Sequence, residues 1–251
     1  MSRTVLALTG ADRVDFLQGL VTNDVSRPGG IVYAALLTPQ GKFIADFFVV
    51  SEADRLLIDV ATSHAPALAQ RLSMYKLRAD VQIVETGLMV SRGTGPAPEG
   101  ALPDPRHPAL GWRLYGDTDL SEDVDWDALR VAHIIPETGI ELTPETYILE
   151  AGFERLHGVD FRKGCYVGQE IAARMKHKTE LKKGLAQVRT AGTVAPGDEI
   201  TSDGKPAGTI HTVSGDMAIA YLRYDRVTGM ATPGATLDLV ATAEDLRKSH
   251  A

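Results

Sequence analysis

The C-terminal part of the chain contains the pattern that most restricts the fold. After Lys183 the sequence consists of short β-prone runs separated by glycines. These glycines are Gly192, Gly197, Gly204, Gly208, Gly215, Gly229 and Gly234. Short strands separated by turn residues at such intervals are typical of a barrel or a sandwich. We therefore expect residues 181–251 to form a small C-terminal β-barrel.

The N-terminal part instead mixes strands and helices. Residues 4–8 are apolar and β-prone, and residues 12–21 carry apolar side chains at helical spacing. The β-prone runs 32–37 and 43–50 flank Thr38-Pro39-Gln40-Gly41-Lys42, whose turn chemistry predicts an antiparallel hairpin. The other expected elements are a strand over residues 56–60, a helix over 64–75 and a strand over 81–84. These elements predict an α+β block.

The middle of the chain begins with a stretch rich in glycine and proline. Residues 93–108 contain Pro96, Pro98, Pro103, Pro105 and Pro108, which favours an exposed loop or a subdomain junction. Beyond it we expect a helix over residues 126–133, a loop over 156–164 and a helix over 168–177. The fold class is therefore α+β. The predicted division is 1–92 and 93–180 as two α+β subdomains, and 181–251 as the barrel.

A single cysteine and a net charge of −7 exclude several classes of function. One thiol allows no intrachain disulfide, and it cannot hold a zinc ion or an iron-sulfur cluster without further ligands, so we predict no permanently bound metal. The acidic balance argues against direct nucleic-acid binding, which needs clustered lysines and arginines. No apolar run approaches the roughly 18 residues that span a bilayer, and none resembles a signal peptide. We expect a cytoplasmic protein without a membrane partner.

The string Phe161-Arg-Lys-Gly-Cys165-Tyr-Val-Gly-Gln-Glu170 carries the strongest chemical signal. It places the only thiol between two glycines, just before a predicted helix. The partial positive charge of a helix N-terminus and the ammonium of Lys163 both favour thiolate over thiol. Cys165 is then a candidate nucleophile, metal ligand or redox-active thiol. The alternative is that Cys165 is a buried, purely structural residue.

Other motifs are absent or ambiguous. The sequence has no HExxH pair, P-loop or GxGxxG, and His133, His157 and His177 are scattered. A basic run begins within the cysteine string and is either a solvated helix face or an anion site. Its members are Arg162, Lys163, Arg174, Lys176, Lys178, Lys182 and Lys183.

The cysteine string resembles the signature of the YgfZ family, a folate-binding branch of the glycine-cleavage T-protein (aminomethyltransferase) fold. The resemblance covers nearly the whole chain. Its other segments are residues 10–24, 38–46, 75–78 and 129–139. It implies two α+β subdomains and a C-terminal β-barrel around a central pocket.

The same resemblance implies a role in iron-sulfur cluster assembly or repair, including the clusters of enzymes that thiomethylate tRNA. Iron-sulfur carrier and client proteins are then the partners, with a folate-like molecule, such as tetrahydrofolate, in the pocket. The candidate catalytic residues are Cys165, Lys163, Gly164, Tyr166, Gly168, Gln169 and Glu170. The candidate folate-binding residues are Asp46, Trp126, Arg130, Tyr75 and Arg78.

One departure from the T-protein pattern affects the expected chemistry. Ala132 stands where T-proteins have a glutamate that binds the pterin ring, and an unpaired buried pterin edge costs on the order of 1–3 kcal/mol. Glu137 or Glu141 could replace that carboxylate. T-protein-like aminomethyl transfer is therefore not expected. The alternatives are a one-carbon transferase that uses Asp46 and a non-catalytic folate- or RNA-binding module.

Overall fold

The computed structural model describes residues 2–178 and 180–249. The chain forms two compact units, each built from two stretches of sequence. Unit 1 comprises Met1–Val124 and Leu156–Ile171, and unit 2 comprises Asp125–Arg155 and Ala172–Ala251. The division into three subdomains stays a prediction, because a compact unit can contain more than one subdomain.

Unit 1 is built on a five-stranded antiparallel sheet in the order β2-β3-β4-β1-β5. Its strands are β1 (Arg3–Thr9), β2 (Ile31–Leu37), β3 (Phe43–Ser51), β4 (Leu56–Ala61) and β5 (Gln82–Glu85). The predicted hairpin is confirmed as β2 and β3. Its turn is closed by the amide of Thr38, which donates to the carbonyl of Lys42 over 2.8 Å, and Gly41 adopts a φ of 75°.

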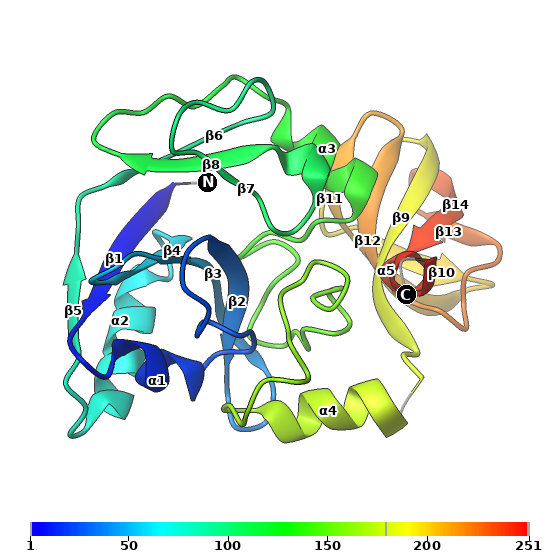
Figure 1. The fold of residues 1–251 in the computed structure, drawn as a ribbon. Helices are drawn as coiled ribbons and strands as arrows, with labels where there is room; N and C mark the ends of the chain where they lie inside the picture. The colour runs from blue at the N-terminus through cyan, green and yellow to red at the C-terminus, as the bar shows by residue number, and fades with distance from the viewer. Residues whose placement is uncertain (1, 179, 250–251) are drawn as a thin grey trace. The chain divides into compact units, whose positions relative to one another are not determined.

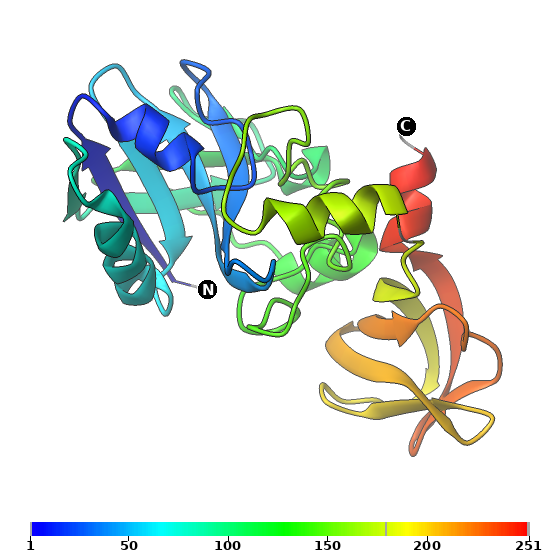
Figure 2. The same ribbon diagram turned by 90° about the horizontal axis from the view of Figure 1, so that it is seen from below.

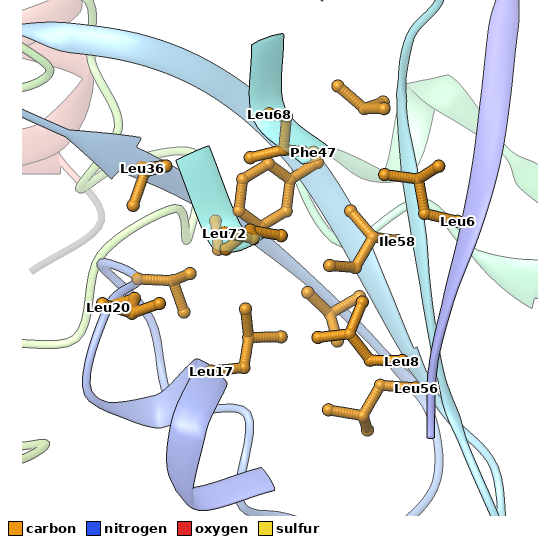
Figure 3. Packing of buried hydrophobic residues seen from close by; sticks show 14 of the residues in the cluster. Leu6, Leu8, Leu17, Leu20, Leu36, Phe47, Leu56, Ile58, Leu68 and Leu72 are labelled. Atoms are coloured by element: carbon orange, nitrogen blue, oxygen red, sulfur yellow. The ribbon is translucent and has the colours of Figure 1, made fainter. Parts of the chain in front are cut away.

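Two helices cover one face of this sheet, α1 (Arg13–Gln18) and α2 (Ala65–Lys76) (Figure 1). Figure 3 shows the apolar core between them and the sheet, where Phe47 lies against Leu68 and Leu72 of α2. Helix α1 is shorter than the apolar spacing predicted. It ends at Gln18, with Gly19 as its C-cap, yet Leu20 and Val21 beyond it are still buried in the same core.

The other face of the sheet packs against a three-stranded sheet in the order β6-β8-β7. These strands are β6 (Met89–Gly93), β7 (Leu102–Pro103) and β8 (Trp112–Gly116), with a single 3-10 turn at Pro108–Leu110. The prediction of an exposed loop over residues 93–108 was therefore wrong in part. Pro103 fits in β7 because this short strand lies at a sheet edge, where proline is tolerated.

Unit 2 contains the predicted β-barrel, which closes in the order β10-β11-β12-β9-β14-β13. Its strands are β9 (Lys183–Gly192), β10 (Glu199–Ser202), β11 (Lys205–Ser214), β12 (Met217–Arg223), β13 (Met230–Thr232) and β14 (Ala235–Thr242). Inward-facing residues such as Val188, Ile210 and Ala220 fill the interior. Figure 2 shows the yellow-to-red strands of the barrel and helix α5 (Ala243–Ser249) at one end.

Two further helices agree with the predicted positions. Helix α3 (Trp126–His133) begins where the carboxylate of Asp125 accepts from the amide of Ala128 over 2.9 Å. Helix α4 (Gln169–Lys178) follows the cysteine string. Across residues 2–178 and 180–249, no helix has the length and hydropathy needed to cross a membrane.

Candidate functional site

The cysteine loop, residues 156–168, belongs to unit 1 and has no regular helix or strand, which confirms the predicted loop over residues 156–164. Its single thiol, Cys165, is exposed. The alternative that Cys165 is a buried apolar residue was therefore wrong. The described part of the chain holds no group of three or more potential metal ligands, so any metal bound by Cys165 would need ligands from elsewhere.

The first half of the loop is fixed to the segment that follows α1. The hydroxyl of Thr22 donates to the carbonyl of Gly158 over 2.6 Å, and the amide of Asp160 donates to the carbonyl of Thr22 over 3.0 Å. The side-chain amide of Asn23 donates to the carbonyl of His157 over 2.6 Å. These bonds join residues more than 130 positions apart in the sequence.

Lys163 is buried and also links the cysteine loop to the end of α1 and the segment that follows it. Its ammonium donates to the carbonyls of Gln18, Val21 and Asn23 over 2.5–2.9 Å, which uses all three of its N–H donors. Burial lowers the pKa of Lys163 to about 8. The predicted role of Lys163 in favouring the Cys165 thiolate stays a prediction, and no donor of its ammonium is left for the thiol.

Tyr166 fixes the loop on the other side of the cysteine. Its side chain is 6% exposed, and its ring lies 5.4 Å from the Lys163 nitrogen. The buried hydroxyl has no hydrogen-bond partner in the described part of the chain, and burial raises its pKa to about 12. Gly164 and Cys165 are exposed between these two buried side chains. The loop is thus anchored on both sides of its thiol.

Gly168 joins the loop to the β2–β3 hairpin turn. It adopts a φ of 83°, and a Cβ at this position would lie 2.6 Å from the carbonyl oxygen of Thr38. At Gly41, a Cβ would lie 2.8 Å from the Cβ of Ile171 in α4. The structure therefore brings together two segments that the sequence singled out, and glycine is required at both contacts.

The last two predicted loop residues lie in the first turn of α4. The amide of Gln169 donates to the carbonyl of Tyr166 over 3.3 Å, and its side chain is half-buried. Glu170 is exposed. Their assignment as catalytic residues stays a prediction.

Asp46, the predicted folate carboxylate, lies on β3 and is buried. It accepts a hydrogen bond of 2.9 Å from the hydroxyl of Tyr33. Its neighbours Ala45 and Phe47 face the α2 side of the sheet, so Asp46 faces the other side. Tyr75 packs on the α2 side, and Arg78 is exposed beyond α2. The structure does not bring Tyr75 and Arg78 to Asp46.

Trp126 and Arg130, also predicted to bind folate, belong to α3 of unit 2, where Trp126 is half-buried. Arg130 is buried in what we call the Arg130 cluster. The guanidinium contacts Asp127, the carbonyl of Ile135, Glu137, Glu141 and Thr212 over 2.5–3.2 Å. These five acceptors match its five N–H donors.

Taken together, the residues predicted to bind folate therefore do not fit a pterin ring. Glu141 accepts from Arg130, from the hydroxyl of Thr212 and from the amide of Glu137, so its carboxylate is already in use. Ala132 is exposed and has no polar side chain. Folate binding stays a prediction.

The basic run that begins within the cysteine string is not one continuous face. Lys163 is buried, and Lys176 forms an ion pair with Glu154. Arg162, Arg174, Lys182 and Lys183 are exposed, and the Lys178 side chain lies outside the described residues.

Sequence reasoning missed a buried charge network in unit 1. Asp59 accepts from Arg3 over 2.6 Å, from Arg113 over 2.5 Å and from the hydroxyl of Tyr115 over 3.0 Å. Burial would raise the pKa of Asp59, but the two guanidinium groups lower it to about 2. The only sequence signal was a charged residue within the apolar run Leu-Leu-Ile-Asp59-Val-Ala.

Comparison with known proteins identifies relatives named as iron-sulfur cluster assembly factors. The human mitochondrial factor IBA57 is 27% identical over 97% of this chain and 83% of its own length. The mitochondrial IBA57 homologue of Mycosarcoma maydis is 29% identical over 77% of this chain. The match covers 57% of that fungal protein, so the chain spans little more than half of its length.

Two further matches concern the fold. The family described as "CAF17, C-terminal beta-barrel domain" matches residues 182–247, which contain the barrel. The aminomethyltransferase T of the glycine cleavage system from Bartonella henselae gives a TM-score of 0.75 over 94% of this chain and 82% of its own, at 13% identity. At this identity the match shows the fold alone. The predicted T-protein-like fold is confirmed, whereas the narrower YgfZ assignment stays a prediction.

Proposed function

We propose that this protein assists the assembly or repair of iron-sulfur clusters, with Cys165 as its working thiol. The observation that carries the proposal is the exposure of Cys165 between two buried anchors, Lys163 and Tyr166. The names of the relatives, which designate iron-sulfur cluster assembly factors, support the same class of function.

The loop geometry suits a thiol that is presented to another protein. Cysteine thiolates are the usual protein ligands of iron-sulfur clusters, and a cluster takes several of them. This chain supplies one, so a cluster held here would be shared with a carrier or client protein. Cys165 would act as a transient ligand or as a redox-active thiol, within a YgfZ-like role that extends to the clusters of tRNA-thiomethylating enzymes.

A folate-dependent transferase is the weaker alternative. The T-protein likeness shows the fold alone, and the residues expected around a pterin do not fit it as a set. Asp46 is the residue on which such an enzyme would depend. No step of the proposed function uses a folate.

Complementation tests the proposed function. The chain is expressed in a bacterium that lacks its own family member, and the activity of a four-iron enzyme and the thiomethylation of tRNA are measured under oxidative stress. We expect wild type to restore both, and an empty vector to restore neither. Failure of soluble wild-type protein to restore the enzyme would contradict the proposal.

Asp46→Asn separates the two functions in the same assay. Asparagine can still accept the hydrogen bond from Tyr33, so the variant should fold. An iron-sulfur factor that works through Cys165 should keep its activity with this change. Loss of activity at a normal protein level would favour the transferase.

A further inference from the structure

A groove of about 690 Å³ lies within unit 2, outside the site described above. One wall is the barrel surface of β10, β11 and β12, and the other includes Met175 of α4 and the segment Leu181–Lys183. Most of the exposed lining surface is apolar and includes Leu181 and Pro206, while Ile200 and Ala207 lie behind it in the barrel core. The charged lining residues besides Glu150 are Glu180, Lys182, Lys183, Glu199 and Arg223. Both the volume and the apolar walls are typical of sites for small organic molecules.

Glu150 gives this groove its polar centre. The residue is 7% exposed, and its carboxylate accepts a 2.6 Å hydrogen bond from the hydroxyl of Tyr221. The other carboxylate oxygen lies 4.0 Å from the ammonium of Lys183, beyond hydrogen-bond distance, and the Lys183 side chain is half exposed. Since an ionised carboxylate can accept about four hydrogen bonds, Glu150 retains unused acceptor capacity.

The position of Glu150 is fixed before any ligand arrives. Its carbonyl accepts from the amide of Leu185 at the start of β9 over 2.8 Å. At the adjacent Gly184, a Cβ would lie 2.6 Å from the same carbonyl oxygen, so only glycine allows this close approach. Leu185 of β9 is paired with Tyr221 of β12 in the barrel. The backbone of Glu150, which is bonded to Leu185, and the phenol of Tyr221 are therefore held by neighbouring strands.

The nearly buried carboxylate of Glu150 has one hydrogen bond and a long ion pair with the half-exposed Lys183, so a further N–H donor at hydrogen-bond distance would stabilise it. A ligand that places a cationic N–H group on Glu150 and an apolar body on the barrel wall satisfies both parts of the groove. We propose that this groove binds a small organic amine with an aromatic or aliphatic body. Tyr221 donates to the carboxylate, which leaves the second carboxylate oxygen for the ammonium of the ligand.

Three probes with the same apolar body test the proposal: 2-naphthylmethylamine, 2-naphthylmethanol and 2-naphthoate. Binding to the full chain is measured by isothermal titration calorimetry, and its location by amide chemical shifts of the barrel strands. We expect the amine to bind at least about tenfold more tightly than the alcohol, and the carboxylate to bind most weakly. Absence of amine binding, or preference for the naphthoate, would overturn the proposal.

Two variants and a control assign the binding to the groove. Glu150→Gln keeps the side-chain shape and should make the affinities for amine and alcohol nearly equal. Thr209→Trp should fill the groove and abolish binding of both. Asp238→Asn removes an exposed carboxylate on β14, outside the groove, and should change nothing. Unchanged amine affinity in folded Glu150→Gln or Thr209→Trp would overturn the proposal. Cys165 is not part of the groove, so this test is independent of the proposed function.

Discussion

The cysteine loop and Arg130 were both selected from the sequence as functional, yet they use their reactive groups differently. Every N–H donor of Arg130 has an acceptor within unit 2. Cys165 is exposed, while the neighbouring Lys163 and Tyr166 are buried. The comparison shows that a side chain available for chemistry is one that stays exposed and is not already used in hydrogen bonds to its neighbours. The predictions below follow from this difference, in decreasing order of their effect on stability.

Replacing Arg130 should have the largest effect. Arg130→Met removes a guanidinium that is 4% exposed and leaves the buried Glu141 without its cation. We expect a loss of about 3–5 kcal/mol in the free energy of unfolding, measured by urea denaturation. Arg189→Met, which breaks an exposed ion pair with Asp216, should cost less than about 0.5 kcal/mol. If Arg130→Met is as stable as wild type, the fold does not depend on the guanidinium. Arg130 would then belong with the residues available to a ligand.

Lys163→Met comes next, since it removes one charged donor from three backbone carbonyls at the base of the cysteine loop. We expect a loss of about 3 kcal/mol in the free energy of unfolding. The exposed Lys205→Met serves as the control and should be neutral to within about 0.5 kcal/mol. Equal stability of the two variants would mean that Lys163 does not anchor the loop.

Acid should weaken the charge network of unit 1 by a smaller amount. The pKa of Asp59 is about 2 in the folded protein, below its ordinary value of 3.8. The unfolded chain therefore takes up this proton first, and the stabilisation present above pH 3.8 is lost as the pH falls through about 2. Asp59 should contribute about 2 kcal/mol to this loss.

The free energy of unfolding, measured between pH 5 and pH 2 for wild type and Asp59→Asn, isolates that contribution. The variant starts less stable because Arg3 and Arg113 lose the negative charge of Asp59, but its stability should fall less steeply with acid. Parallel curves would show that the pKa of Asp59 is the same in the folded and the unfolded protein.

Local sequence patterns predicted strands β1 to β5, the barrel and helix α3 because their causes are local, whereas β6 and β8 were not predicted. Apolar residues at helical spacing and the cap at Asp125 define α3, and turn residues define the hairpin. Strand β7 was missed because proline and glycine signal a loop, whereas Pro103 is accommodated at a sheet edge.

Whether each site residue is buried and hydrogen-bonded or exposed could not be predicted in the same way. Arg130 donates a hydrogen bond to Thr212, which is 82 positions away in the sequence. Lys163 donates to the carbonyl of Val21, which is 142 positions away. Flanking glycines permit either exposure or burial of a cysteine, so only the tertiary structure settled that Cys165 is exposed. Motifs identified the residues, but long-range contacts determined which of them stay available.

Cys165→Ala tests the central claim most directly, because it should have the smallest effect on stability and the largest on function. Four-iron enzyme activity in the complemented strain is measured alongside the free energy of unfolding of the purified variant. The account predicts loss of the activity that wild type restores, with stability changed by less than about 0.5 kcal/mol, because the side chain is exposed. Full activity with Cys165→Ala, at a soluble level equal to that of wild type, would contradict the account.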